Sequence, residues 1–410
     1  MNKLRSRVAV GPLRRLVPLP VPAVPAVDRL VAELRPAEPL YCLRPHVLEA
    51  TAARFVAGFA GDVLYAVKCN PEPAVLRGLW RGGVRHFDCA SPGEIRLVRQ
   101  LFPAAQIHYM HPVKQASFIR EAYAEHGVRD FSLDSVEEID KIVAATDGAE
   151  DLGLYIRLAM PKGLATYDLS GKFGAPPALA VALLRRARAV SARLGLCFHV
   201  GSQCMDPDAY ARALALAGAV IAEAGVPIDG IDVGGGFPVS YPDQIPPALD
   251  RYFTAIRDGF AALGLPPQAR LWCEPGRALV AAGASVVAQV VARRGDVLHL
   301  NDGVYGSLSD AGTPKWRFPA RALRPDGAPF SGALESFSFY GPTCDSADFM
   351  AGPFALPADI GTGDWIELGQ LGAYGACLRT GFNGFERILI AEVADQPLLA
   401  TPGHLALDAA

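Results

Sequence analysis

Three stretches decide the fold: Leu194-Gly-Leu-Cys-Phe-His-Val-Gly-Ser202, Ile231-Asp-Val-Gly-Gly-Gly-Phe237 and Leu271-Trp-Cys-Glu-Pro-Gly-Arg277. Each begins as a short apolar run and then breaks off into polar residues and glycines. Longer segments with helical character separate the three stretches. Strands that alternate with helices in this way predict βαβ units and a parallel sheet.

The same alternation extends back towards the N-terminus. The expected strands are 63–68, 87–90, 107–110, 131–134, 154–158, 196–200, 230–233 and 270–274. The expected helices are 74–81, 92–101, 115–126, 135–145, 178–194, 207–224 and 248–263. Eight strands alternating with helices fit a (β/α)8 TIM-like barrel, which takes about 250 residues. An open doubly wound sheet is the alternative, but its Gly-x-Gly-x-x-Gly signature does not follow the first strand.

The pattern changes after about residue 280. Short β-like runs at 286–291, 318–323, 337–340, 365–368 and 388–392 follow one another without long helical segments, which indicates a mainly β domain. A chain of 410 residues is also long enough for two domains. We therefore expect a Pro-rich segment at 1–40, either partly disordered or joined to the β domain, a barrel at 41–280 and a β domain at 281–410.

Composition narrows the class of protein. A net charge of −3 and a sequence pI near 6.3 argue against a nucleic-acid binder. The eight cysteines form no Cys-x-x-Cys pair, so a reduced cytoplasmic compartment is expected and no metal site is predicted. Prolines at 18, 20, 22 and 25 disfavour a signal-peptide helix, and no apolar stretch reaches membrane-spanning length. These features predict a cytoplasmic protein that acts on small molecules.

Polar residues end six of the eight expected strands. In a (β/α)8 barrel the carboxyl ends of the strands carry the active site, so these residues would meet on one rim. They are Lys68, Asp88, Arg157, His199, the segment that follows Asp232, and Glu274. Each has an ordinary structural explanation by itself, but together they indicate a site.

Two of these rim features point to a cofactor. The three glycines at 234–236 expose backbone N–H groups that bind an anion, and Arg277 could clamp it, although a plain turn explains the glycines equally well. Lys68 follows a buried strand, and a desolvated lysine in such a place has a lowered pKa and forms Schiff bases. The alternative explanation for Lys68 is an ion pair with Asp88. A reactive lysine beside a phosphate cradle suggests pyridoxal 5′-phosphate.

Glu274 and His199 agree with this cofactor. An acidic group beside the pyridine nitrogen keeps the ring an electron sink, and a planar imidazole can stack on the ring. A histidine in an apolar strand is otherwise usually a core residue, so the assignment of His199 to the site depends on its place at the rim.

At these residues the chain resembles the fold-type III pyridoxal-phosphate decarboxylases, in the branch of the ornithine, lysine and diaminopimelate enzymes. The matching segments, in order, are Tyr65–Asn70, Phe87–Ser91, Lys172–Gly174, His199–Ser202, Asp232–Phe237, Glu274–Arg277, Asn301–Gly306, Gly341–Asp345, Gly372–Tyr374 and Phe382–Phe385. The resemblance implies an alanine racemase-like architecture, a barrel followed by a mainly β domain.

The resemblance also implies roles for single residues. Lys68 would hold the cofactor covalently, Glu274 would bind the pyridine nitrogen, and His199 would stack on the ring. Asp88 and Arg157 would support the cofactor face near Lys68. The phosphate would be bound by Ser202, Gly235, Gly236, Arg277 and Tyr374.

Two further residues would come from the partner subunit of a head-to-tail homodimer, with composite sites at the interface. Cys344 would protonate the carbanion left by the departing CO2, a role that suits a thiol whose ordinary pKa of about 8.5 keeps it protonated at neutral pH. Asp345 would bind the distal ammonium of the substrate. The implied reaction is decarboxylation of a basic amino acid, L-ornithine to putrescine in polyamine biosynthesis or L-lysine to cadaverine.

One segment departs from the family. The eukaryotic ornithine enzymes carry a Tyr-Asp pair after the Asn-Asp-Gly-Val-Tyr-Gly motif, whereas this chain reads Ser307-Leu-Ser-Asp-Ala-Gly-Thr-Pro314. Asp310 is the candidate replacement for that substrate-binding aspartate. Three alternatives stay open: a diaminopimelate decarboxylase, whose relatives usually show Cys-Glu-Ser at 344–346, an amino-acid racemase, and a non-catalytic decarboxylase homologue.

Overall fold

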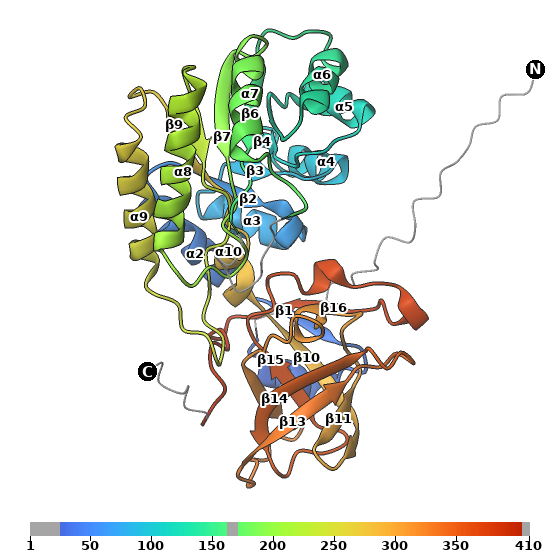
Figure 1. Cartoon of the computed structure of the whole chain (residues 1–410). Coiled ribbons are helices and arrows are strands. Elements are labelled where there is room, and N and C mark those ends of the chain that lie inside the picture. Colours follow the sequence, from blue (N-terminus) through green and yellow to red (C-terminus); the bar gives the residue numbers. More distant parts are fainter. Residues whose placement is uncertain (1–24, 162–170, 404–410) are drawn as a thin grey trace, which may run out of the picture.

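The computed structural model describes residues 25–161 and 171–403, and within them eight parallel strands close into a barrel (Figure 1). Consecutive strands pair with each other, and β9 returns to β2 with Val63 opposite Cys273. The strands are β2 (Asp62–Ala66), β3 (His86–Asp88), β4 (Gln106–Tyr109), β5 (Asp130–Leu133), β6 (Gly153–Arg157), β7 (Arg193–Cys197), β8 (Gly230–Asp232) and β9 (Arg270–Cys273).

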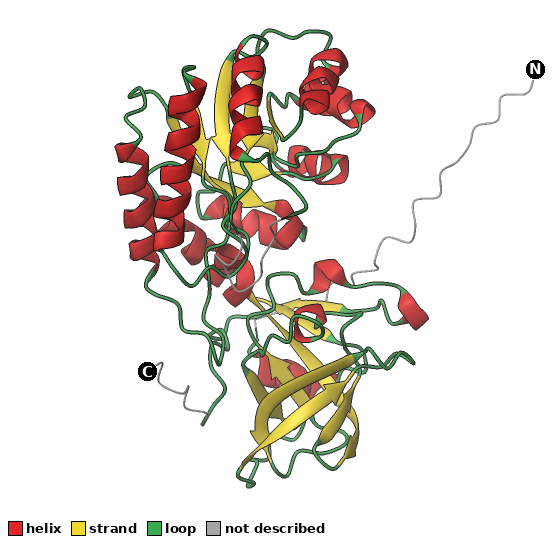
Figure 2. Cartoon of the chain, viewed as in Figure 1, coloured by secondary structure: helices red, strands yellow, loops and turns green. Residues whose placement is uncertain are grey.

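Helices surround this barrel (Figure 2). They are α2 (Pro45–Gly58), α3 (Pro73–Arg81), α4 (Pro92–Leu101), α5 (Ala116–His126), α6 (Val136–Ala145), α7 (Pro177–Arg188), α8 (Asp208–Ala224) and α9 (Leu249–Ala262). Local sequence explains where two of them start. The hydroxyl of Ser91 accepts from the N–H of Glu94, and that of Ser135 accepts from the N–H of Glu138, so each serine caps the first turn.

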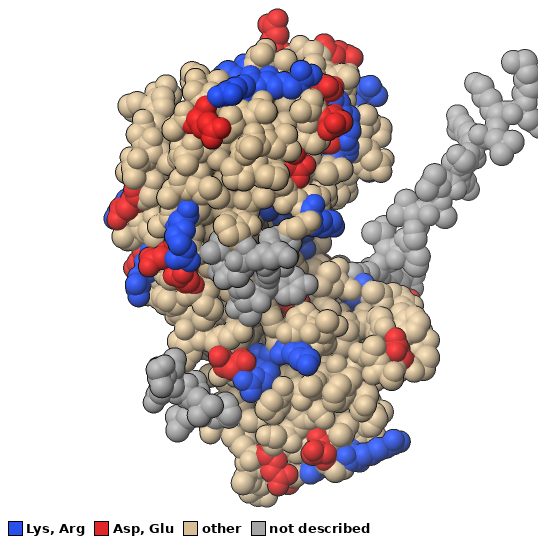
Figure 3. Space-filling model, in the orientation of Figure 1, with Lys and Arg blue, Asp and Glu red and all other residues tan. Residues whose placement is uncertain are grey.

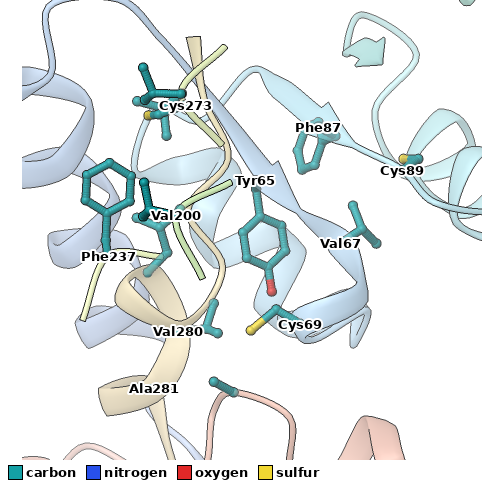
Figure 4. Packing of buried hydrophobic residues seen from close by; sticks show 14 of the residues in the cluster. Tyr65, Val67, Cys69, Phe87, Cys89, Val200, Phe237, Cys273, Val280 and Ala281 are labelled. Atoms are coloured by element: carbon teal, nitrogen blue, oxygen red, sulfur yellow. The ribbon is translucent and has the colours of Figure 1, made fainter. Parts of the chain in front are cut away.

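Apolar side chains pack on both sides of the strands. Outside the barrel, Tyr65 and Val67 join a large buried cluster with Phe237 and Cys273 (Figure 4). A separate buried cluster contains Leu64, Met110, Tyr155, Cys197 and Trp272, which come from strands on different sides of the barrel. Tyr155 and Trp272 stack with ring centroids 4.6 Å apart. The barrel is therefore a packed core that opens only at its ends.

The second domain is a mainly β structure below the barrel in Figure 1. It follows α10 (Arg277–Val280) and the one-turn helix η2 (Ala281–Gly283), and its main path has the strand order β12-β15-β10-β11-β13-β14. The bounds are β10 (Ala284–Arg294), β11 (Val297–Leu300), β12 (Ala320–Leu323), β13 (Leu334–Tyr340), β14 (Phe349–Pro357) and β15 (Trp365–Leu368). Short one-turn helices, η3 (Ser309–Ala311), η4 (Ala376–Leu378) and η5 (Phe382–Gly384), lie in its loops.

The N-terminal part of the chain contributes a strand to this second domain. After α1 (Val27–Leu34), β1 (Leu40–Leu43) pairs antiparallel with β10 and parallel with β16 (Leu389–Glu392). The buried Arg44 after β1 bridges the buried Glu367 of β15 and Asp395, at 2.9 and 3.0 Å. Residues 1–24 of the Pro-rich segment lie outside the described residues.

The predicted barrel and β domain are confirmed, but several element boundaries differ. The first predicted strand ends at Ala66, and Lys68 lies in the one-turn helix η1 (Val67–Cys69). The helix expected at 178–194 ends at Arg188, because β7 begins at Arg193. The elements α1, α2, β11 and β14 were not predicted, whereas β1 is a strand of the β domain at the end of the N-terminal segment that was expected to be disordered or to join that domain. In the described ranges, no helix is long and apolar enough to cross a membrane.

Candidate active site

A cavity of about 500 Å³ lies at the carboxyl ends of the barrel strands. Ten of the predicted site residues line it: Lys68, Asp88, Arg157, His199, Ser202, Gly235, Gly236, Glu274, Arg277 and Tyr374. They come from the ends of six strands and from one loop of the β domain. The structure thus brings together residues up to about 300 positions apart in the sequence.

Lys68 reaches the cavity from the turn after β2. Tyr65 is buried in the outer apolar cluster and Ala66 lines the cavity, as the alternation of strand side chains requires. In the turn η1 that follows, Val67 joins the outer cluster and Lys68 lines the cavity. The Lys68 Nζ lies 3.4 Å from Oδ2 of the buried Asp88. This carboxylate raises the pKa of Lys68 and outweighs the opposing effect of burial. Of the two alternatives that the sequence left open for Lys68, a lowered pKa and an ion pair with Asp88, the structure shows the ion pair.

A loop of the β domain holds this turn in place. The N–H of Tyr374 donates to the carbonyl of Cys69 at 3.0 Å, and Nδ2 of Asn70 donates to the carbonyl of Gly372 at 2.7 Å. Tyr374 itself has a φ of +52°, in the left-handed region that non-glycine residues seldom adopt. The two domains thus meet at the cavity, and Tyr374 enters it from the second domain.

Glu274 forms the buried acidic end of the cavity. It follows β9 and is 5% exposed. Burial, followed by the neighbouring Asp232 and Asp88 carboxylates, raises the pKa of Glu274 well above its usual range. Asp232 is held by the N–H of Gly234, which donates to its Oδ1 at 2.8 Å.

His199 presents a neutral imidazole to the cavity. Its Nδ1 accepts from the N–H of Gly201 at 2.9 Å, which assigns the ring proton to Nε2. Burial, together with the positive charges of Arg157 and Lys68, lowers the pKa of His199 well below its ordinary value. A neutral planar ring in this position is suited to stacking.

The glycine turn after β8 has no room for a side chain at either of its cavity-lining glycines, Gly235 and Gly236. A Cβ on Gly235 would lie 2.7 Å from the carbonyl oxygen of Glu274 and 3.0 Å from Nε2 of His199. A Cβ on Gly236 would lie 2.5 Å from the carbonyl oxygen of Gly201, and its φ of +108° is open only to glycine. The backbone of this turn can therefore approach a bound group closely.

Arg277 closes the opposite part of the site at the start of α10. It is 6% exposed, its Nη1 donates to the hydroxyl of Tyr241 at 2.9 Å, and its Nη2 donates to Oδ2 of Asp310 at 3.0 Å. Its guanidinium carbon lies 3.7 Å from the ring centroid of Trp316. Asp310 therefore pairs with an arginine of the cavity wall and is not among the described residues that line the cavity.

Cys344 and Asp345 also do not occur among the described lining residues. The Cys344 thiol is exposed, its N–H donates to Oδ1 of Asn383 at 3.0 Å, and Asp345 accepts from the hydroxyl of Tyr305. Buried Asp348 shapes this loop, since its carboxylate accepts from the N–H groups of Val304 and Thr343 at 2.7 and 3.1 Å.

Sequence reasoning missed one wall of the cavity. Met110, His111 and Pro112 line it after β4, together with Lys172 and Phe173. The rings of His111 and Phe173 meet edge to face with centroids 5.2 Å apart. The Lys-Phe-Gly motif at 172–174 was a usable signal, and so was His111, a polar residue directly after the strand predicted at 107–110.

The residues present fit pyridoxal 5′-phosphate. Oε1 of Glu274 and Nε of Arg277 are both buried and have no hydrogen-bond partner among the described residues. A carboxyl group suits a pyridine nitrogen and a guanidinium N–H suits a phosphate oxygen, while the Lys68 amine suits an aldehyde. Gly235 and Gly236 line the cavity without side chains, so a bound group can reach their backbone.

Comparison with known families agrees with this geometry. Residues 47–281 match the family described as "Pyridoxal-dependent decarboxylase, pyridoxal binding domain". Residues 282–372 match "Pyridoxal-dependent decarboxylase, C-terminal sheet domain". The chain belongs to the pyridoxal-dependent decarboxylases. The predicted family, fold and cofactor are thereby confirmed, whereas the roles of single site residues in this decarboxylase stay predictions.

Relatives of the decarboxylase include enzymes of known substrate. It is 34% identical over 344 residues to the lysine/ornithine decarboxylase of Selenomonas ruminantium, covering 82% of this chain and 84% of the relative. It is 34% identical over 370 residues to the ornithine decarboxylase of Mus musculus, covering 82% and 76%. Antizyme inhibitor 2 of Xenopus laevis is also 34% identical over 358 residues, covering 79% and 74%.

Solved structures share the fold of the decarboxylase. The lysine/ornithine decarboxylase of Vibrio vulnificus, complexed with putrescine, superimposes with a TM-score of 0.76 at 31% identity. The alignment covers 89% of this chain and 97% of that one.

Proposed function

We propose that this chain decarboxylates a basic amino acid, with L-ornithine as its main substrate, putrescine as the product and L-lysine as a second substrate. The observation that carries the proposal is the single cavity that unites Lys68, His199, Glu274 and Arg277. It is supported by relatives named as ornithine and lysine/ornithine decarboxylases, one of them solved with putrescine.

Each cavity residue has a task that follows from its surroundings. Lys68 anchors the cofactor through its amine, and Asp88 holds that amine in place at 3.4 Å. Glu274 binds the pyridine nitrogen, neutral His199 lies on the ring face, and Arg277 binds the phosphate. When bound there, pyridoxal 5′-phosphate supplies an electron sink for the electron pair left by the departing carboxylate.

Decarboxylation also needs a proton donor for the substrate carbon that loses its carboxylate. We assign this task to the exposed Cys344 of a second copy, with Asp345 beside it to bind the distal ammonium. Three apolar residues in and after the one-turn helices η4 and η5 are 42–44% exposed: Leu378, Phe382 and Phe385. Asn383 of η5 accepts a hydrogen bond from the Cys344 backbone, so this exposed apolar group lies next to Cys344. Exposed apolar side chains around these residues support a homodimer interface there.

The direct test is a comparison of substrates. Purified protein loaded with pyridoxal 5′-phosphate is incubated with L-ornithine, L-lysine and meso-diaminopimelate, and released CO2 is measured. We expect release from ornithine, and less from lysine. Turnover of diaminopimelate alone would contradict the proposal. Racemised substrate without CO2 would identify a racemase, and lack of both products would favour a non-catalytic homologue.

A further inference from the structure

We propose that Asp310 is a positioning residue: it fixes the Arg277 guanidinium for the cofactor phosphate and does not bind the distal ammonium of the substrate. This inference rests on the proposed role of Arg277 as a phosphate ligand. It follows from the contacts of the segment that replaces the Tyr-Asp stretch of the eukaryotic enzymes.

The guanidinium of Arg277 is held from three sides. Asp310 accepts from Nη2 at 3.0 Å, Tyr241 accepts from Nη1 at 2.9 Å, and the ring of Trp316 covers the guanidinium face. Both terminal nitrogens have a partner, whereas Nε is buried and has none in the described part of the chain. Each terminal nitrogen also keeps a second N–H. The contacts therefore fix the plane of the guanidinium and leave Nε–H oriented for a further acceptor.

The loop that carries Asp310 is built around this arginine. The N–H of Trp316 donates to the carbonyl of Asp310 at 2.9 Å, which closes the segment between them and brings both side chains to Arg277. The hydroxyl of Ser309 donates to the carbonyl of Tyr374 at 3.3 Å. One short loop thus contacts two predicted phosphate ligands, Arg277 from the barrel and Tyr374 from the β domain.

The burial of the pair explains why the contact matters. Arg277 and Asp310 have side-chain exposures of 6% and 17%, so each charge has lost most of its water. A desolvated guanidinium needs a charged partner, and the planar fork loses little further freedom once it is oriented. Because Asp310 faces Arg277 and is not among the described residues that line the cavity, the distal ammonium has to find its carboxylate elsewhere.

The test separates phosphate binding from everything else. Apoprotein is titrated with pyridoxal 5′-phosphate and with pyridoxal, which lacks the phosphate, and binding is followed by absorbance. In Asp310→Asn the affinity for pyridoxal 5′-phosphate should fall about tenfold, the usual effect of losing a hydrogen bond between charged groups. Pyridoxal should bind as in the unaltered protein. At saturating cofactor, the KM for ornithine should stay within about twofold, because the substrate makes no contact with residue 310.

Matched variants complete the experiment. Tyr241→Phe removes the second contact of the guanidinium and should cause the same selective loss. Asp243→Asn breaks a nearby ion pair with Arg317, 2.8 Å long, and should leave both affinities unchanged. Equal losses for both ligands, no loss, or tighter binding of pyridoxal 5′-phosphate would each overturn the proposal. A raised KM for ornithine with unchanged cofactor affinity would instead make Asp310 a substrate ligand. The titrations stay readable even if ornithine is not the substrate.

Discussion

At the residue scale, Lys68, which pairs with Asp88, is the amine that the proposed function assigns to the cofactor. Lys68→Ala removes this amine, so the absorbance band of covalently bound cofactor should disappear. After borohydride reduction and denaturation, the variant should carry no cofactor, whereas the unaltered protein retains it. The matched control is Lys315→Ala, which removes an exposed lysine of a β-domain loop and should leave the band unchanged. A normal band in Lys68→Ala would exclude this residue as the anchor.

The residues of the site differ in how clearly the sequence predicts them. Lys68, His199 and Glu274 were found because each is a polar residue directly after an apolar strand, which is a local signal. The partner of Asp310 could not be found in this way. Its ion pair with Arg277 joins a β-domain loop to the start of α10, and it forms only when the two domains pack, with the guanidinium over the ring of Trp316.

At the scale of elements, the glycine turn after β8 offers a clean test of the phosphate cradle. Gly235 does not have a positive φ, so Gly235→Ala adds no backbone strain, but its Cβ would meet the Glu274 carbonyl and His199. We expect the affinity for pyridoxal 5′-phosphate to fall at least tenfold, corresponding to about 1.4 kcal/mol. Gly361→Ala, where a Cβ meets nothing within 4 Å, is the control. Unchanged affinity in Gly235→Ala would show that the turn does not approach the cofactor.

The opposite end of the barrel carries a row of titratable groups. At the starts of neighbouring strands, Nδ1 of His86 lies 3.0 Å from Nε2 of His108, and His108 Nδ1 lies 3.1 Å from Asp130 Oδ2. Asp62 faces His86 from β2 at 3.7 Å, and Arg270 of β9 adds a positive charge. Burial, followed by the neighbouring His108, lowers the pKa of His86 to about 4.

The lowered pKa of His86 predicts that the folded barrel loses stability in acid. In the unfolded chain a histidine has a pKa of about 6.5. Between pH 6.5 and 4, His86 therefore binds a proton in the unfolded chain but not in the folded barrel. The free energy of unfolding should therefore fall as the pH drops through this window, by up to about 3 kcal/mol. Unfolding followed by circular dichroism should show a weaker pH dependence in His86→Gln than in His46→Gln, an exposed control. Equal pH dependence in both variants would contradict the assignment.

Element boundaries show what local patterns leave out. The capped starts of α4 and α6 were predicted well, because Ser91 and Ser135 act on their own first turns. Most predicted strands end one to three residues late, since apolar side chains continue past the last paired residue into the site loops. The bounds of β1 have no such local signal. Leu40 pairs with Val287 and Leu389, and pairing between residues this far apart in the sequence cannot be predicted from the few residues around Leu40.

At the scale of the whole molecule, charge does little to select a cationic substrate. The net charge is only −3, and acidic and basic side chains are interspersed on the face in Figure 3. Among the described lining residues of the cavity, the carboxylates are Asp88 and Glu274, and both are committed to the cofactor end in the proposed function. Selection of a distal ammonium therefore has to involve a group from outside this cavity, which is the reason to test assembly.

Mixed dimers provide that test. Chains carrying Lys68→Ala and Cys344→Ala are co-expressed with different tags, and dimers holding one of each are purified. If Cys344 acts in the cavity of the other copy, one of the two sites combines an intact lysine with an intact thiol, and ornithine decarboxylation should recover to about half the normal value per dimer. If Cys344 acts within its own chain, both sites lack one group and the mixed dimer stays as inactive as the two parent variants.

Recovery also requires that the exposed Leu378, Phe382 and Phe385 are covered in the dimer, so Phe382→Asp should reduce both dimer formation and the recovered activity.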